Sequence, residues 1–315
     1  MSTTKKSKSL TNHPLLDLVA KIDKKFVEDL PPVEAIPTDP EDFYNWWWQT
    51  YGKGCEECLL ALTRNKVVKA DGNTKASIMI VGEGPGFLED LAALPMVGPM
   101  ELRGSHCSLC SKVKDCYSQR LLGKPFSSGM PPKKVTCNPD YKTTKQLPST
   151  FYIRSAGAIV DGILINKWKF SYPRHNWIVQ YNANHPNEPW THDSPWFITN
   201  VVLCRTTDIT GIKDKTPDSL PRSKCKRWLA FQWAAVQPKL IIAVGRVALA
   251  TLMGSEEGSK SIVPNTIVQT KFGPVLFQNH PASMMRENSK TLKAYGFAKF
   301  ATTLEKALEY VGLPI

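Results

Sequence analysis

Apolar runs and expected helices alternate along most of the chain. Four apolar runs have the length and bulk of buried strands, at residues 78–81, 196–203, 239–245 and 274–278. Stretches that we expect to be helical follow three of them, at about residues 225–236, 246–253 and 294–311. Strands separated by helices are typical of a parallel sheet with helices on both faces. We therefore expect an α/β fold.

The first 50 residues differ from the rest of the chain. A polar, basic tail precedes an expected helix at residues 15–30, and four prolines between residues 31 and 40 indicate a linker. The tail has no apolar stretch of the kind found in a secretory signal. No segment approaches the roughly 18 apolar residues of a membrane span. Three consecutive tryptophans at 46–48 cannot all face one side of a helix, so we expect at least one to be partly exposed.

A glycine-rich loop follows the first expected strand. Its sequence is Gly82-Glu83-Gly84-Pro85-Gly86. Residues with so little side chain let the backbone turn sharply and let a flat ligand approach it closely. Ligands of open α/β sheets bind at the carboxyl ends of the strands, so this loop is a candidate wall of a binding site. Its glycine spacing matches neither a dinucleotide fingerprint nor a phosphate-binding loop.

The charge of the chain favours a polyanion as partner. The 40 Lys and Arg residues outnumber the 28 Asp and Glu residues, which gives a net charge of +12. Residues 103–150 hold nine Lys or Arg and two Asp, so more than half of the surplus lies in this one segment. Each phosphate that is neutralised by such a surface releases condensed counterions, which favours binding to nucleic acid.

Eight cysteines indicate metal or cluster ligation in a reducing cytosol, because two of the pairs have C-x-x-C spacing and the chain has no signal peptide. Cys55 and Cys58 form the first pair, and two more ligands are needed to complete a shell. The second set is Cys107, Cys110, Cys116 and Cys137. A loop-like segment of this size cannot supply its own apolar core, so zinc or an iron–sulfur cluster would stabilise it. Free cysteines in a loop are the third alternative.

Five separated motifs occur together in one order. They are the Cys55–Cys58 pair, the glycine-rich loop, TNVVLCR at 199–205, KLIIAVG at 239–245 and NHPASMMR at 279–286. With Cys225 among them, they resemble the iron–sulfur (family 4 type) uracil-DNA glycosylases and related phage-encoded domains, over residues 50–102 and 155–310. The resemblance implies a three-layer α/β/α fold with a central parallel four-stranded sheet. Residues 1–50 would precede a domain at 51–315, which a basic, cysteine-rich insertion at 99–154 interrupts.

The resemblance also implies the reaction. The chain would hydrolyse the N-glycosidic bond of uracil, or a related pyrimidine, flipped out of single- or double-stranded DNA at the start of base excision repair. It would act as a cytoplasmic monomer, in a bacterium or a phage-infected cell, without a membrane partner. Glu83 would orient water and stabilise the sugar cation, His280 would donate to uracil O2, and Asn200 would match the O4 and N3–H edge.

The remaining implied roles concern the pocket, the DNA and the cofactor. The pocket would be lined by Gly82, Gly84, Pro85, Gly86 and Met96. Phosphates would be contacted by Lys271, Arg286, Lys133 and Lys134. A [4Fe–4S] cluster would be held by Cys55, Cys58, Cys204 and Cys225. Zinc would use the same four ligands, and the second cysteine set would hold a second cluster or zinc.

The sequence departs from the family pattern at one pocket position. Where the family has P-F-V-G, this chain has Met96 in place of the phenylalanine that stacks on the flipped base. Methionine is polarizable but less planar. Two further hypotheses follow: a DNA-binding or replication-associated module with reduced or no base excision, and excision of a modified pyrimidine. The loop at 205–224 has no histidine, which disfavours covalent capture of DNA.

Overall fold

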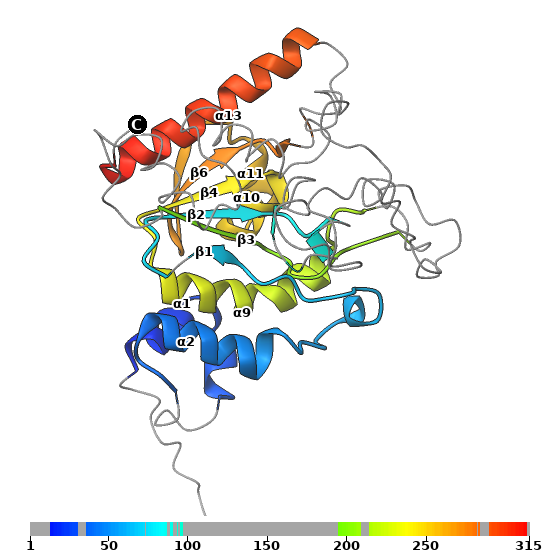
Figure 1. Cartoon of the computed structure of the whole chain (residues 1–315), viewed down its shortest axis with the longest axis vertical. Helices are drawn as coiled ribbons and strands as arrows, with labels where there is room; N and C mark the ends of the chain where they lie inside the picture. The colour runs from blue at the N-terminus through cyan, green and yellow to red at the C-terminus, as the bar shows by residue number, and fades with distance from the viewer. Residues whose placement is uncertain are drawn as a thin grey trace, which may run out of the picture.

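The computed structural model describes ten segments of the chain: residues 13–30, 36–72, 74–86, 89–90, 93, 95–96, 195–208, 214–281, 283 and 290–313. In these residues a single twisted sheet lies between helices (Figure 1). The expected insertion at residues 99–154 lies outside the described segments, together with its four cysteines, Lys133 and Lys134.

The described sheet has six strands in the order β1-β3-β2-β4-β6-β5. Its four central strands are parallel, as the sequence predicted: β3 (Trp196–Asn200), β2 (Ile78–Gly82), β4 (Leu240–Val244) and β6 (Gly273–Gln278). Two antiparallel edge strands were not predicted, β1 (Asp71–Gly72) and β5 (Ile267–Thr270). The first has only two residues, and the second is half-buried and carries no continuous apolar run.

Helices cover both faces of the sheet, which confirms the predicted α/β fold. One face packs against α9 (Ser219–Val236) and α10 (Arg246–Met253), and the other packs against α13 (Lys290–Val311). Because alternate residues of a strand point to opposite faces, β2, β3 and β4 are buried along their whole length. These continuous apolar runs are typical of parallel strands covered on both sides.

The N-terminal helices join the same core. Helices α1 (Pro14–Glu28) and α2 (Pro40–Trp47) pack against α9, as Figure 1 shows on the lower side of the molecule. Each begins with a proline in its first turn and a capping side chain; Asp39, for example, accepts from two main-chain N–H groups of α2 at 3.0 Å. Trp47 is fully buried, whereas Trp46 and Trp48 are half-buried, as predicted.

Three short helices complete the described elements: η2 (Trp48–Gly52), η3 (Leu59–Leu62) and α11 (Glu256–Lys260). None of the helices in the described segments has the length and the apolar character that crossing a membrane requires.

Candidate active site

The glycine-rich loop leaves the sheet at the carboxyl end of β2, next to the end of β3. Gly82 pairs with Asn200 in the parallel ladder. A Cβ atom at Gly82 would overlap Asn200 Oδ1 and come within 3.1 Å of Met96 Cε. The absence of a side chain at this position therefore lets the amide and the thioether lie directly over the end of β2. Three of the predicted pocket residues are in this way brought together.

Glu83 crosses from β2 toward the end of β4. A Cβ atom at Gly245 would overlap the Glu83 carboxylate, so this carboxylate lies against the main chain at the carboxyl end of β4. The N–H of Gly245 donates to Gln278 O at 2.8 Å, at the end of β6. These contacts connect Glu83 to the strand that leads into His280, the predicted imidazole.

A second carboxylate, Glu89, ties the loop together. Its side chain accepts from the N–H of Gly86 at 2.6 Å and from the N–H of Met96. Burial raises the pKa of this carboxyl from 4.5 to about 7, and the negative charge of Asp214 contributes to the rise. The two N–H groups and the Asn200 amide act in the opposite direction, because they stabilise the charged form. Glu89 thus fixes Met96 beside Gly82, although the sequence patterns did not single it out.

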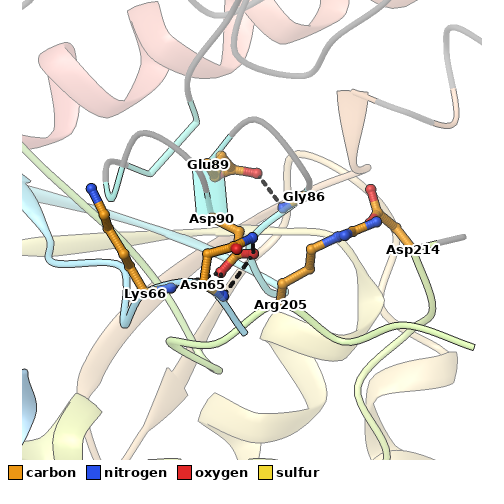
Figure 2. A network of polar contacts seen from close by, with 7 residues as sticks. All are labelled: Asn65, Lys66, Gly86, Glu89, Asp90, Arg205 and Asp214. Atoms are coloured by element: carbon orange, nitrogen blue, oxygen red, sulfur yellow. Dashed lines mark hydrogen bonds and ion pairs between the residues drawn. The ribbon is translucent and has the colours of Figure 1, made fainter. Parts of the chain in front are cut away.

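Its neighbour Asp90 holds the loop to a distant segment. Asp90 is fully buried, and its carboxylate accepts from Asn65 N at 3.0 Å, Asn65 Nδ2 at 2.6 Å and Lys66 N at 3.2 Å. Figure 2 shows these bonds converging on Asp90, while the Lys66 side chain extends away from the carboxylate. The carboxylate is thus satisfied by neutral donors, and it positions residues 65–66 beside the site.

An ion pair closes another side of the loop. Arg205 Nε lies 2.6 Å from Asp214 Oδ1, and the arginine is buried whereas the aspartate is half exposed (Figure 2). A Cβ atom at Gly86 would lie 3.3 Å from the other oxygen of Asp214, so the loop packs closely against this pair. Pro217 packs in the same manner against Gly84, at 3.1 Å from the position of a Cβ atom.

His280 lies two residues beyond β6, on the loop at the carboxyl edge of the sheet, and is half-buried. The predicted acid, amide and imidazole thus all lie at the carboxyl ends of parallel strands. Lys271 does not: it is exposed in the turn between β5 and β6, at the amino-terminal end of β6. Six strand residues separate it from the site edge, roughly 20 Å. Arg286 lies outside the described residues.

Four cysteines lie close enough to act on one another's electrostatics: Cys204, which follows β3, and Cys225, Cys55 and Cys58. Cys204 and Cys225 are buried, Cys55 and Cys58 are half-buried, and all four are free. Burial raises the pKa of the Cys204 thiol to about 12, with smaller contributions from Cys55 and Cys58, whereas Arg64 lowers it. Burial also raises the pKa of Cys225, and the other three thiols add to the rise. Cys55 and Cys58 thus both contribute to the raised pKa of each buried thiol.

Basic side chains surround this cysteine set. Arg64 Nη1 donates to Cys204 Sγ at 3.7 Å. Glu57, between the two half-buried cysteines, pairs with Lys224 at 3.9 Å and Arg227 at 3.6 Å, on either side of Cys225. No group of three or more His, Cys, Asp or Glu side chains in the described segments is arranged to hold a metal ion. A single tetrahedral zinc would draw the sulfurs to about 3.8 Å from one another, whereas a cluster spaces them more widely.

The fold and the site define an α/β protein whose glycine-rich loop, carboxylate and amide gather at the carboxyl edge of a parallel sheet. A family model described as the uracil DNA glycosylase superfamily matches residues 70–310. The chain belongs to the uracil DNA glycosylase superfamily, as its motifs predicted.

Short segments of the chain are also similar to curated relatives. The "Type-4 uracil-DNA glycosylase" of Saccharolobus solfataricus is 46% identical over 44 residues, which is 14% of this chain and 20% of the relative. The protein of the same name from Thermotoga maritima is 48% identical over 46 residues, or 15% and 24% of the two chains. These aligned segments therefore span less than a quarter of the length of the relatives.

Several site residues were missed by the sequence reasoning. Glu89 and Asp90 lie only three and four residues beyond the glycine-rich loop, so an acidic pair at the start of the next helical turn was the available signal. Gly245 ends the KLIIAVG motif but had no predicted role, and Arg64 belongs to no motif that the sequence analysis named. Their significance comes from contacts with Glu83 and Cys204, which are 162 and 140 positions away in the chain.

Proposed function

We propose that this chain is a DNA glycosylase that hydrolyses the N-glycosidic bond of uracil, or of a closely related pyrimidine, in an extruded nucleotide. The observation that carries the proposal is the superfamily match over residues 70–310, which includes the loop at β2, the end of β3 and His280. The type 4 names of the relatives support uracil as the base, over the short segments that align.

The proposed reaction needs two kinds of stabilisation. As the bond between C1′ and the base nitrogen breaks, positive charge develops on the sugar and negative charge on the base. Glu83 is suited to orient the attacking water and to stabilise the sugar, because its carboxylate is held against Gly245 at the edge of the sheet. His280 would donate a hydrogen bond to the leaving base at O2. Asn200 would read the O4 and N3–H edge with its amide.

The pocket wall follows from the loop. Gly82 and Gly84 permit close packing, with Asn200 and Met96 over the first and Pro217 against the second. Pro85 is buried, and Gly86 donates its N–H to Glu89. These contacts hold the loop in place from the side of the protein. Met96 would contact the face of the base, with its N–H bound by the same carboxylate.

We also propose that Cys55, Cys58, Cys204 and Cys225 hold a [4Fe–4S] cluster, which would stabilise this part of the fold when bound. The contributions of Cys55 and Cys58 to the raised pKa values of Cys204 and Cys225, and the N–H donor of Arg64, support the assignment. The second cysteine set, Cys107, Cys110, Cys116 and Cys137, would bind a second cluster or zinc. Phosphate contacts would come from the basic insertion, including Lys133 and Lys134, and from Arg286.

The activity is tested with a labelled oligonucleotide that contains one uracil. Wild-type protein should leave alkali-labile abasic sites, whereas Glu83→Ala and His280→Ala should each lose most of the rate and keep their affinity for DNA. Glu257→Ala is the matched control, because this carboxylate is 86% exposed and pairs only locally with Lys260. Intact protein that releases no uracil would remove the proposal.

A second candidate function is favoured by Met96, which stands where the family pattern has the stacking phenylalanine and carries no aromatic ring. In that case the chain would bind DNA tightly and in a salt-sensitive way but release no base. Mass spectrometry of released bases separates uracil excision from excision of a modified pyrimidine.

For the cofactor, anaerobically purified protein should absorb broadly near about 400 nm and contain roughly four or eight irons per chain. Iron-free, colourless protein would refute the cluster assignment.

A further inference from the structure

At the carboxyl edge of the sheet, one row of paired residues runs across the four parallel strands from β3 to β6. Gly82 is paired with Asn200, and Val244 is paired with Gln278. Strands β2 and β4 are neighbours whose pairing keeps Gly82 and Val244 at the same level. The four residues therefore form a row in the order Asn200, Gly82, Val244, Gln278.

The two amides in this row face the same side of the sheet. Side chains two residues apart on a strand share a face. Ile198 and Leu276, which precede Asn200 and Gln278 by two residues, both belong to the core on the α13 side. Val244, between the amides, belongs to that core as well. A glutamine and an asparagine are thus placed at the two ends of a single apolar row.

Gln278 offers a hydrogen-bond donor that the protein does not use. Only 1% of the residue is exposed, and its Oε1 accepts from Asn279 N at 2.9 Å. Because an N–H group donates to this atom, it must be the amide oxygen, and the other amide atom is the donor Nε2. In the described part of the chain Nε2 has no hydrogen-bond partner, whereas the Asn200 amide stabilises the charged form of Glu89. Buried donors are nearly always satisfied, so the unpartnered amide donor of Gln278, in one row with the Asn200 amide, points to a ligand.

The distance between the amides suits a pyrimidine. Three strand spacings separate the two main chains by about 14 Å, and the Asn200 amide lies over Gly82, one strand closer to Gln278. A pyrimidine with a hydrogen bond of about 2.9 Å on either side needs roughly 10 Å. With Asn200 on O4 and N3–H, the base carries O2 on the other side of N3, where it is an acceptor for a donor on β6.

We infer that Gln278 is a base-binding residue, whose Nε2 donates a hydrogen bond to O2 of the extruded pyrimidine. The inference rests on the proposed function and deepens it, because it assigns a second donor besides His280 to the oxygen that gains charge as the base leaves. A donor aimed at developing charge contributes more in the transition state than in the bound substrate. Gln278 would therefore affect the rate of base release more than the affinity.

The test compares Gln278→Met, which keeps the length of the side chain and removes the donor, with Gln269→Met, in which an exposed strand glutamine is changed in the same way. Single-turnover release is measured for uracil, 2-thiouracil and 4-thiouracil in otherwise identical oligonucleotides. We expect Gln278→Met to release uracil at least about tenfold more slowly. It should also reduce the preference for uracil over 2-thiouracil, because sulfur is a poor acceptor, and leave the ratio for 4-thiouracil unchanged.

Equal rates and ratios in the Gln278→Met and Gln269→Met variants would overturn the inference. Should Gln278→Met fail to fold, Gln278→Asn keeps the amide but withdraws it by one methylene, and the same losses are expected. An oligonucleotide with non-hydrolysable 2′-fluoro-2′-deoxyuridine separates the two proposals. If wild-type protein releases no base but binds this oligonucleotide more tightly than the Gln278→Met variant does, the proposed function fails and the base contact stands. Without that affinity difference, both fail.

Discussion

The contact between Glu83 and Gly245 gives the sharpest test of the site. Gly245 has φ 101° and ψ 159°, a conformation that is essentially confined to glycine, and a Cβ atom there would overlap the Glu83 carboxylate. Gly245→Ala therefore has two effects: it strains the main chain, and it displaces the proposed catalytic acid. We expect the second effect to dominate the loss of activity.

The chain offers a control that separates these effects. Gly273 has nearly the same φ, 98°, but among the described residues nothing beyond its two chain neighbours lies within 4 Å of the position of its Cβ atom. Both alanine variants should lose about 1–3 kcal/mol in free energy of unfolding from main-chain strain. Only Gly245→Ala should also move Glu83, and a displacement of about 1 Å from productive geometry reduces a rate about 100-fold.

Two measurements are needed for each variant. Urea unfolding gives the change in stability, and single-turnover release of uracil gives the change in rate under conditions where each variant remains folded. We expect the rate of Gly273→Ala to stay within about threefold of the wild type and that of Gly245→Ala to fall about 100-fold. Equal rates in the two variants would refute the reasoning, because the position of the Glu83 carboxylate would then have no consequence.

Three further predictions concern the loop and the cysteine set. Because the folded state raises the pKa of Glu89 from 4.5 to about 7, it holds the proton more tightly, so stability should fall as the pH rises from about 4.5 to 7, by on the order of 3 kcal/mol. Glu89→Gln should lose this dependence in urea unfolding at pH 5 and pH 8; an unchanged dependence would exclude Glu89 as its source. Met96→Phe should release uracil about two- to tenfold faster, because an aromatic ring stacks better on the base; a folded variant with no gain would contradict the stacking role. Arg64→Gln should lose its visible absorbance in air several times faster than Lys66→Gln, because Arg64 alone of the two donates to a cysteine sulfur; equal bleaching would exclude that contribution.

Local patterns in the sequence were sufficient for the four parallel strands and for the glycine-rich loop. The apolar run at residues 78–81 became β2 because a strand covered on both faces needs apolar residues at every position. The glycine-rich loop was recognisable because glycine and proline constrain the main chain wherever they occur. The family followed from motifs whose order in the chain is itself sequence information.

Pairings across the sheet could not be deduced in this way. Lys271 was expected near phosphates, but strand direction places it at the amino-terminal end of β6, because a short antiparallel β5 precedes it. The raised pKa of Glu89 depends on burial beneath the loop and on Asp214, which is 125 positions away. Burial and charge act through space, and no window of neighbouring residues records them.

Periodicity therefore predicted the four parallel strands and the start of the glycine-rich loop, and the order of the motifs predicted which superfamily the chain joins. The register between strands decided the contacts of the site: Glu83 lies against Gly245, and the amides of Asn200 and Gln278 lie at the same level of the sheet. Such contacts depend on which strands become neighbours and at what level they pair, and these are properties of the assembled sheet rather than of any single segment.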